Sequence, residues 1–318
     1  MQIFKNPNFD FVRWRWHALA LSLVVMIAGL VVIGTRGLQK GVDFEGGTIV
    51  ILSFDQTPRV NEITEALGGD AVVQRYGPEE NNDVMIRVKR VGQESGADLS
   101  REVGNIITSL KAANVGSFDD TPIGTEIVGP VVGEQLRQQG IWATVLAMAG
   151  ILGYIALRFQ FSFAVGAVVA TLHDLLICLA FLAFFRYDMT LNVVAGLLTI
   201  TGYSVNDTIV IFDRVRENLR GMRRDNLSTI VNTAVNQTLS RTVITAGTTL
   251  LSVVALYLFG GEVLEGCAFT MMVGIISGTY STVFIASAIA IILQGRKPLK
   301  GQPAAAAATT RASKRRAS

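Results

Sequence analysis

The sequence is poor in charge, cysteine and histidine. Only 17% of its 318 residues are charged, whereas a soluble domain usually carries about 25%. The two cysteines, Cys178 and Cys267, lie in apolar runs and do not indicate a disulfide, and the two histidines, His17 and His173, are too few for a zinc site. No catalytic carboxylate pair, nucleophile triad or phosphate-binding glycine loop is placed to act. The sequence therefore argues against an enzyme and against a bound cofactor or metal.

Long apolar runs are the feature that the chain has in excess. Half of the residues are hydrophobic, and six runs approach the ~20 residues that a helix needs to span a bilayer. The first is long and lacks a cleavage site, so it is predicted to be an uncleaved anchor. The runs cover residues 17–35, 140–157, 162–184, 190–212, 241–260 and 265–293.

Lysine and arginine in the short flanks predict the orientation, because basic loops stay on the cytoplasmic side. With six spans, all the basic flanks fall on one side, which places both termini in the cytoplasm and residues 36–138 in the periplasm. The expected parts are a cytoplasmic N-terminus (1–16), a first membrane helix (17–35), an outer domain (36–138), five more membrane helices (139–293) with a basic cytoplasmic segment (213–240), and a disordered basic tail (294–318).

The outer segment has the composition of an α+β domain. β-branched stretches begin near Gly47, Ala71, Asp83 and Thr125, and they are separated by two helical patterns. In the third strand, Val84, Ile86 and Val88 are expected to point inward, with Met85, Arg87 and Lys89 outward. Thr57 is the expected N-cap of the first helix. The order β-α-β-β-α-β predicts a ferredoxin-like domain.

Asp207 is the most unusual residue of the apolar runs. A charge at bilayer depth costs roughly 2.5–3.5 kcal/mol, so an intramembrane aspartate is a functional candidate by default. On a helix it shares a face with Gly196, Ile200 and either Tyr203 or Ser204, a small and polar face typical of helix contacts. Asp213 and Arg214 are expected to close that helix at the cytoplasmic edge.

The fifth run begins with Arg241, which heads a stripe containing Thr245, Thr248 and Ser252. Such a stripe is typical either of a hydrated, proton-conducting crevice or of helix packing. If Asp207 faces Arg241, proton binding to the aspartate releases the arginine, and proton loss restores the pair.

Asp174, near the centre of the third run, is a secondary candidate for the same pathway. Its neighbour His173 points about 100° away on a helix and is interpreted as a packing residue. In the sixth run, Gly274 and Gly278 form a small-xxx-small pair that predicts close helix packing.

Four blocks of sequence resemble the SecF family of accessory subunits of the bacterial Sec protein translocase. They are VDFEGG (42–47), GYSVNDTIVIFDRVREN (202–218), NQTLSRT (236–242) and GTYSTVFIA (278–286). The resemblance covers residues 1–295 and implies a place in the bacterial inner membrane, without a catalysed covalent reaction. It also implies pairing with SecD in a twelve-helix unit, similar to the resistance-nodulation-division exporters, that uses the proton-motive force to assist preprotein translocation.

The resemblance also implies partners and site residues. The partners are SecD, the SecYEG channel, the translocating preprotein, YidC and YajC, with membrane lipid around the helices. The proton-site residues carried over are Asp207 and Arg241, while Asp174, Thr245 and Thr248 are secondary candidates. Asp43, Gly46 and Gly47 in the VDFEGG block are expected to form a hinge, because glycine permits a sharp turn.

Two other functions stay open on the sequence. A half-transporter could export a small molecule or a lipid by the same proton chemistry, and an apolar pocket in the outer domain would favour it. A non-transporting scaffold would use Asp207 and Arg241 only as a structural ion pair.

Overall fold

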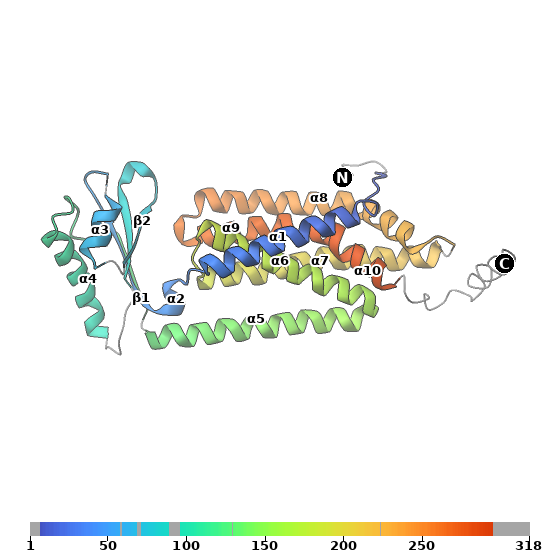
Figure 1. The fold of residues 1–318 in the computed structure, drawn as a ribbon, viewed down its shortest axis with the longest axis horizontal. Helices are drawn as coiled ribbons and strands as arrows, with labels where there is room; N and C mark the ends of the chain where they lie inside the picture. Colours follow the sequence, from blue (N-terminus) through green and yellow to red (C-terminus); the bar gives the residue numbers. More distant parts are fainter. Residues whose placement is uncertain are drawn as a thin grey trace.

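The structure, a computed structural model, describes residues 7–57, 59–68, 71–88, 96–128, 130–222 and 224–294. It combines a helical bundle with a small α+β domain at one end (Figure 1). Apart from Gln294, the expected tail lies outside the described residues, as do Pro58 and Lys89.

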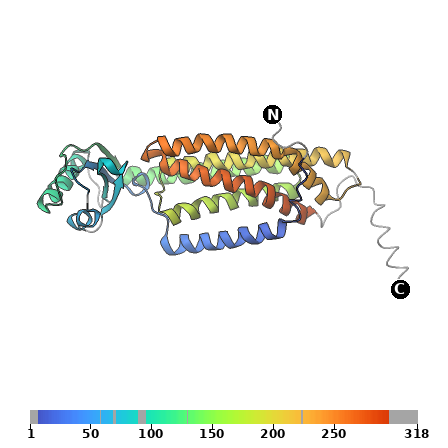
Figure 2. The ribbon, with the colours of Figure 1, turned by 90° about the horizontal axis from the view of Figure 1, so that it is seen from above.

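Six helices of the described chain are long and apolar enough to cross a membrane, which confirms the predicted fold class. Viewed from above, they run side by side and nearly parallel (Figure 2). They are α1 (Arg15–Arg36), α5 (Pro130–Arg158), α6 (Phe161–Phe185), α7 (Leu191–Gly221), α8 (Leu227–Phe259) and α9 (Glu262–Ser281), the last of which continues through a π-helical segment, η2 (Thr282–Ala286), into α10 (Ser287–Gln294).

Helices α7 and α8 are longer than the sequence predicts. The expectation that Asp213 and Arg214 close the fourth membrane helix is wrong, because α7 continues to Gly221. Helix α8 begins at Leu227 rather than near Arg241, and the side chain of Asn226 caps it by accepting from the Thr229 N–H. Hydropathy detects only the lipid-embedded part of a helix, and polar residues extend both helices beyond it.

The α+β domain has the predicted β-α-β-β-α-β order. Its sheet runs β2-β3-β1-β4 with every neighbouring pair antiparallel, as a ferredoxin-like domain requires. The elements are β1 (Gly47–Ser53), α3 (Val60–Ala66), β2 (Ala71–Tyr76), a 3-10 turn η1 (Glu79–Asn81), β3 (Asp83–Val88), α4 (Gly96–Ala112) and β4 (Gly124–Val128). The N-cap position of α3 is Arg59, not the expected Thr57.

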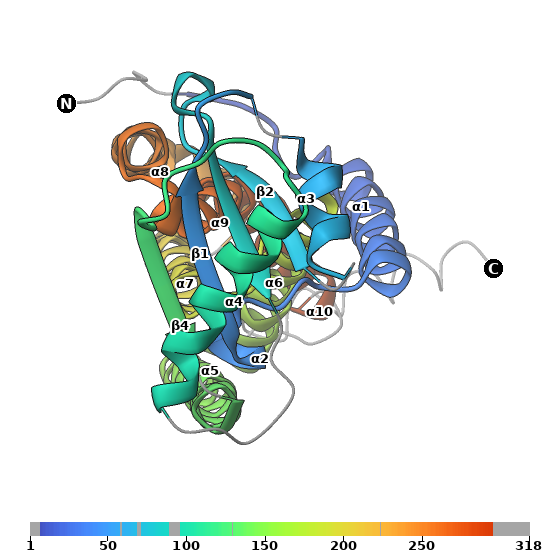
Figure 3. The ribbon, with the colours of Figure 1, turned by 90° about the vertical axis from the view of Figure 1, so that its left-hand side faces the viewer.

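The two faces of the sheet have different environments. Val50, Leu52, Val84 and Ile86 are fully buried under α3 and α4, which lie in front of the sheet in Figure 3. The opposite face is turned toward the bundle. Arg87, predicted to point outward into water, is therefore buried and forms an ion pair with Asp188 in the α6–α7 loop.

The VDFEGG block joins α1 to the sheet through the short helix α2 (Val42–Glu45). Gly46 (φ 72°) and Gly47 (φ 144°) have positive φ angles that favour glycine, as the sequence predicts for a sharp turn. The carboxylate of Asp43 accepts a 2.7 Å hydrogen bond from the first N–H of α7, that of Leu191. A backbone bridge between Lys40, just before this block, and Met189 in the α6–α7 loop adds a second connection nearby.

Candidate functional site

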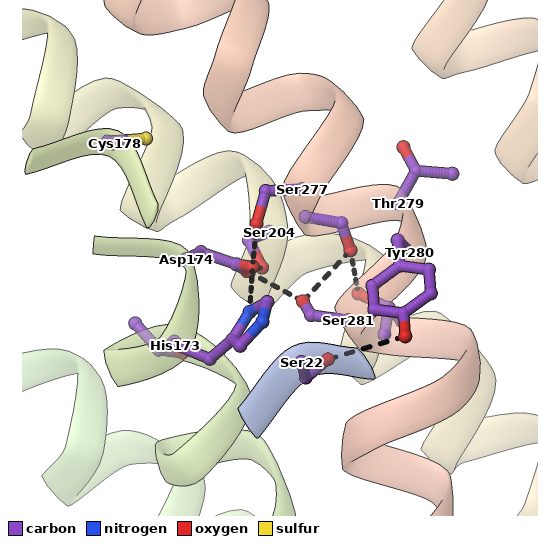
Figure 4. A network of polar contacts seen from close by, with 12 residues as sticks. Ser22, His173, Asp174, Cys178, Ser204, Ser277, Thr279, Tyr280 and Ser281 are labelled. Atoms are coloured by element: carbon purple, nitrogen blue, oxygen red, sulfur yellow. Dashed lines mark hydrogen bonds and ion pairs between the residues drawn. The ribbon is translucent and has the colours of Figure 1, made fainter. Parts of the chain in front are cut away.

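A buried polar centre surrounds Asp174 between α6, α7 and α9 (Figure 4). Asp174 is 2% exposed. Its Oδ2 accepts from the hydroxyls of Ser204 (2.6 Å) and Ser281 (2.7 Å), and its Oδ1 accepts from Ser277 (2.7 Å). The ring nitrogen Nδ1 of His173 lies 3.1 Å from Oδ1. A secondary candidate of the sequence is thus the most completely hydrogen-bonded carboxylate of the bundle among the described residues.

Glycines on α9 bring the serines within reach of Asp174. A Cβ at Gly274 would collide with Ile200 of α7, and one at Gly278 would lie 3.1 Å from the Cβ of Ser204. This confirms the close packing predicted from the Gly274–Gly278 pair. The sequence did not assign a role to Ser277 and Ser281, although each lies three residues after one of these glycines. Their spacing of four residues on one helix face was the available signal.

His173 does more than fill space. Besides its contact with Asp174, its ring lies 6.4 Å from that of Tyr280, and it lines a crevice of about 430 Å³ between α1, α6 and α9. The Tyr280 hydroxyl donates to the carbonyl of Ala18 at 2.8 Å, and Ser22 lies 3.3 Å from that hydroxyl. Asp174 does not line the crevice, so His173 is the member of the pair that faces it.

Asp207 lies on a different side of α7, toward α8. Its Oδ1 accepts a 2.8 Å hydrogen bond from Thr242, while its Oδ2 is buried and has no hydrogen-bond partner. Arg241 precedes Thr242 and is exposed. The ion pairs of the described residues do not join Asp207 to Arg241, so the structure brings Thr242, rather than the arginine, into contact with the carboxylate.

The hydroxyl stripe of α8 is turned away from the bundle. Thr245, Thr248 and Ser252 donate to carbonyls four residues earlier in their own helix, those of Arg241, Ile244 and Thr248. Thr245 and Thr248 are exposed. Thr245 also makes a side-chain hydrogen bond with Tyr203 of α7, so packing within the chain explains part of the stripe.

Polar side chains also gather between the bundle and the domain. A cavity of about 200 Å³ there is lined by Asp43, Arg87 and Asp188, among others. In the same loop, the Tyr187 hydroxyl donates to Glu265 at 2.6 Å. Burial, and then the bond to Glu265, raises the pKa of Tyr187 above its usual range. The predicted hinge residues therefore lie at a junction that joins α1, α7 and the sheet.

Comparison with known proteins relates this arrangement to protein export. A family model for the C-terminal part of the protein export membrane proteins SecD and SecF matches residues 107–296, and one for the SecD/SecF GG motif matches residues 31–58. The SecF protein of Desulfurispirillum indicum is 41% identical over 293 residues, covering 90% of this chain and 92% of its own length. The chain belongs to the SecF family. SecF of Escherichia coli O157:H7 is 38% identical over 290 residues, with 90% and 88% covered.

The SecF chain is also similar to larger solved structures. SecDF of Thermus thermophilus, a translocon-associated membrane protein, has a TM-score of 0.79 at 31% identity over 92% of this chain. SecDF in a form called super-membrane-facing gives a TM-score of 0.67 at 32% identity. The chain spans only 39% and 40% of these two structures. The family assignment agrees with the resemblance found in the sequence.

Proposed function

We propose that this SecF chain pairs with SecD and uses the proton-motive force to assist preprotein translocation through the Sec channel. The observation that carries the proposal is Asp207, an intramembrane carboxylate with one buried oxygen lacking a partner. An intramembrane charge in this state is costly and marks a functional site. A proton that crosses 100 mV supplies about 2.3 kcal/mol, enough to bias two conformations strongly.

The exposed stripe of α8 supports a partner next to Asp207. Arg241, Thr245 and Thr248 are exposed on α8, although Thr245 also contacts Tyr203 of α7. Polar groups facing lipid are unfavourable, so a second set of helices is needed to cover them. The chain aligns with 39% of the length of SecDF, which leaves room for that second set in the related protein. We propose that SecD supplies it and that Arg241 moves to Asp207 when the proton leaves.

The orientation belongs to the same proposal. Basic side chains gather at the end of the bundle opposite the α+β domain, where α7 ends and α8 begins. By the positive-inside rule this end is cytoplasmic, so the domain is periplasmic and both termini are cytoplasmic. The bacterial inner membrane is the proposed location, and SecYEG, YidC, YajC and the preprotein are the proposed further partners.

The deciding experiment is preprotein translocation into inverted vesicles that contain SecD and the Asp207→Asn chain, with an imposed proton gradient. Asp213→Asn is the matched control, because Asp213 is exposed on the same helix and pairs with Arg158 at 3.2 Å. We expect Asp207→Asn to assemble normally and to lose the gradient-dependent part, while Asp213→Asn keeps it. Persistence of gradient dependence in Asp207→Asn rejects Asp207 as the proton carrier.

The same assay separates the two alternatives. A scaffold needs Asp207 and Arg241 only as a pair, so replacing both by leucine should leave translocation intact. A half-transporter needs a substrate pocket in the domain, and the cavity of about 200 Å³ at its base is small for such a pocket. We therefore favour the translocation subunit.

A further inference from the structure

The negative charge of the Asp174 carboxylate has no permanently positive side chain among its contacts in the described residues. Three of its four contacts are serine hydroxyls, which donate without carrying charge. The fourth, His173, is the one described titratable group in contact with the carboxylate. Nearby titratable groups are Cys178 on α6 and Tyr280 on α9, both neutral when protonated, while α1 presents Ser22 and α7 presents Ser204.

A buried negative charge in a bilayer is unfavourable unless it is neutralised. The pair of Asp174 and His173 removes the charge by holding one proton, either as a carboxylate beside an imidazolium or as a carboxylic acid beside a neutral ring. The two groups can share one proton, because the ring nitrogen of His173 lies 3.1 Å from the Asp174 carboxylate. Figure 4 shows this centre closed, with hydrogen-bonding contacts from the serines and His173 to the carboxylate.

We propose that Asp174 and His173 form a second proton-binding site, separate from Asp207, and that loss of its proton separates α9 from α6 and α7. This proposal rests on the proposed function, since it gives protons moving through this chain a second place to bind. His173 exchanges the proton through the crevice that it lines between α1, α6 and α9. When the proton leaves by His173, Asp174 stays negative, and water must enter to solvate it.

The helix geometry shows where the opening takes place. Ser281 is the last residue of α9, and the π-helical segment η2 begins at Thr282. Thr282 contacts Thr208 of α7 at 3.1 Å. The serine and threonine contacts between α9 and its neighbours therefore end where α-helical hydrogen bonds change to π-helical ones. A π-helical turn holds an additional residue that a helix can absorb when it returns to α geometry. We therefore place the hinge of α9 at residues 281–286.

The test measures the distance between α6 and α9 as a function of pH. The full chain is purified with SecD in lipid nanodiscs, Cys178 and Cys267 are replaced by alanine, and spin labels are attached at the exposed positions Leu172 and Ile276. Release of one proton should raise the ratio of open to closed populations about tenfold per pH unit above the pKa of the pair. Asp174→Asn has no carboxylate that becomes an unpaired charge when the proton is lost, so it should keep the closed distance at every pH, and His173→Gln should flatten the pH dependence as well.

Controls keep this test apart from the proposed function. Asp207→Asn should retain the pH-dependent distance change, and Thr279→Ala, whose hydroxyl bonds only to Ile275 of its own helix, should behave as the parent chain. A distance that ignores pH in the parent chain, or that changes equally in Asp174→Asn, overturns the inference. Loss of gradient-driven translocation in Asp207→Asn together with a pH-independent distance would reject the second site and leave the proposed function standing.

Discussion

Asp174 and Asp207 are both intramembrane carboxylates, yet their surroundings differ. Asp174 has four hydrogen-bond contacts, all from residues of this chain, and is 2% exposed. Asp207 accepts one hydrogen bond from Thr242, and its second oxygen has no partner. A carboxylate whose hydrogen bonds all come from its own chain needs no partner subunit. A carboxylate oxygen that lacks a hydrogen bond indicates that a partner supplies one. The comparison thus places Asp174 in the interior formed by α6, α7 and α9, and it supports the proposal that a partner covers α8.

The largest expected effect is a difference between the two aspartates in the free energy of unfolding that is lost when each is replaced by alanine. Asp174→Ala leaves three serines and His173 without their acceptor, and breaking a buried charged network costs about 3–5 kcal/mol. Asp207→Ala removes one hydrogen bond and should cost about 1 kcal/mol. Reversible unfolding of both variants in mixed micelles measures the free energy of unfolding. Equal losses of unfolding free energy in the two variants would show that the different surroundings of the two aspartates do not affect stability.

An intermediate effect concerns the packing on the two sides of α7. Gly274→Ala places a methyl group against Ile200 and should cost about 1–3 kcal/mol through overpacking. Gly247→Ala on α8 meets no atom within 4 Å and should stabilise the helix by up to about 1 kcal/mol. The same unfolding measurement applies. A gain of stability in Gly274→Ala would mean that α9 is not held closely against α7.

The smallest expected effect distinguishes two threonines of α8. Thr242→Val removes the hydrogen bond to Asp207, with a stability loss of about 1 kcal/mol, and should reduce gradient-dependent translocation. Thr248→Val removes bonds within its own helix, to the carbonyls of Ile244 and Thr245, and should change translocation little. Translocation rates with and without the gradient provide the measurement. Identical rates in the two variants would contradict a specific role for the contact between Thr242 and Asp207.

The sequence predicted the six membrane helices and the order of the domain because hydropathy and strand patterns are local signals. It underestimated Asp174, whose serine partners lie 30, 103 and 107 residues away in the chain. A distance along the chain of that size leaves no local pattern, so only the packed helices show which hydroxyls meet the carboxylate.

Arg87 illustrates a second limit. Alternation in a strand shows which residues share a face, and it grouped Arg87 correctly with Met85. It does not show what lies against that face, and the end of the bundle covers it here. Asp188 pairs with Arg87 from a loop 101 residues away, so the sequence pattern could predict the face but not the buried ion pair.

Asp43 connects the first residue of α7 to the segment that leads into the sheet. The 31 residues of α7 form a rod of about 46 Å at 1.5 Å per residue. A tilt of about 5° about its Gly221 end displaces Leu191 by about 4 Å over that length. Because the Leu191 N–H is bonded to Asp43, and Asp43 lies four residues before the first strand, that displacement pulls on the sheet. Asp207 lies near the middle of the same rod, so α7 has the length and the end contact that a lever arm on the α+β domain needs.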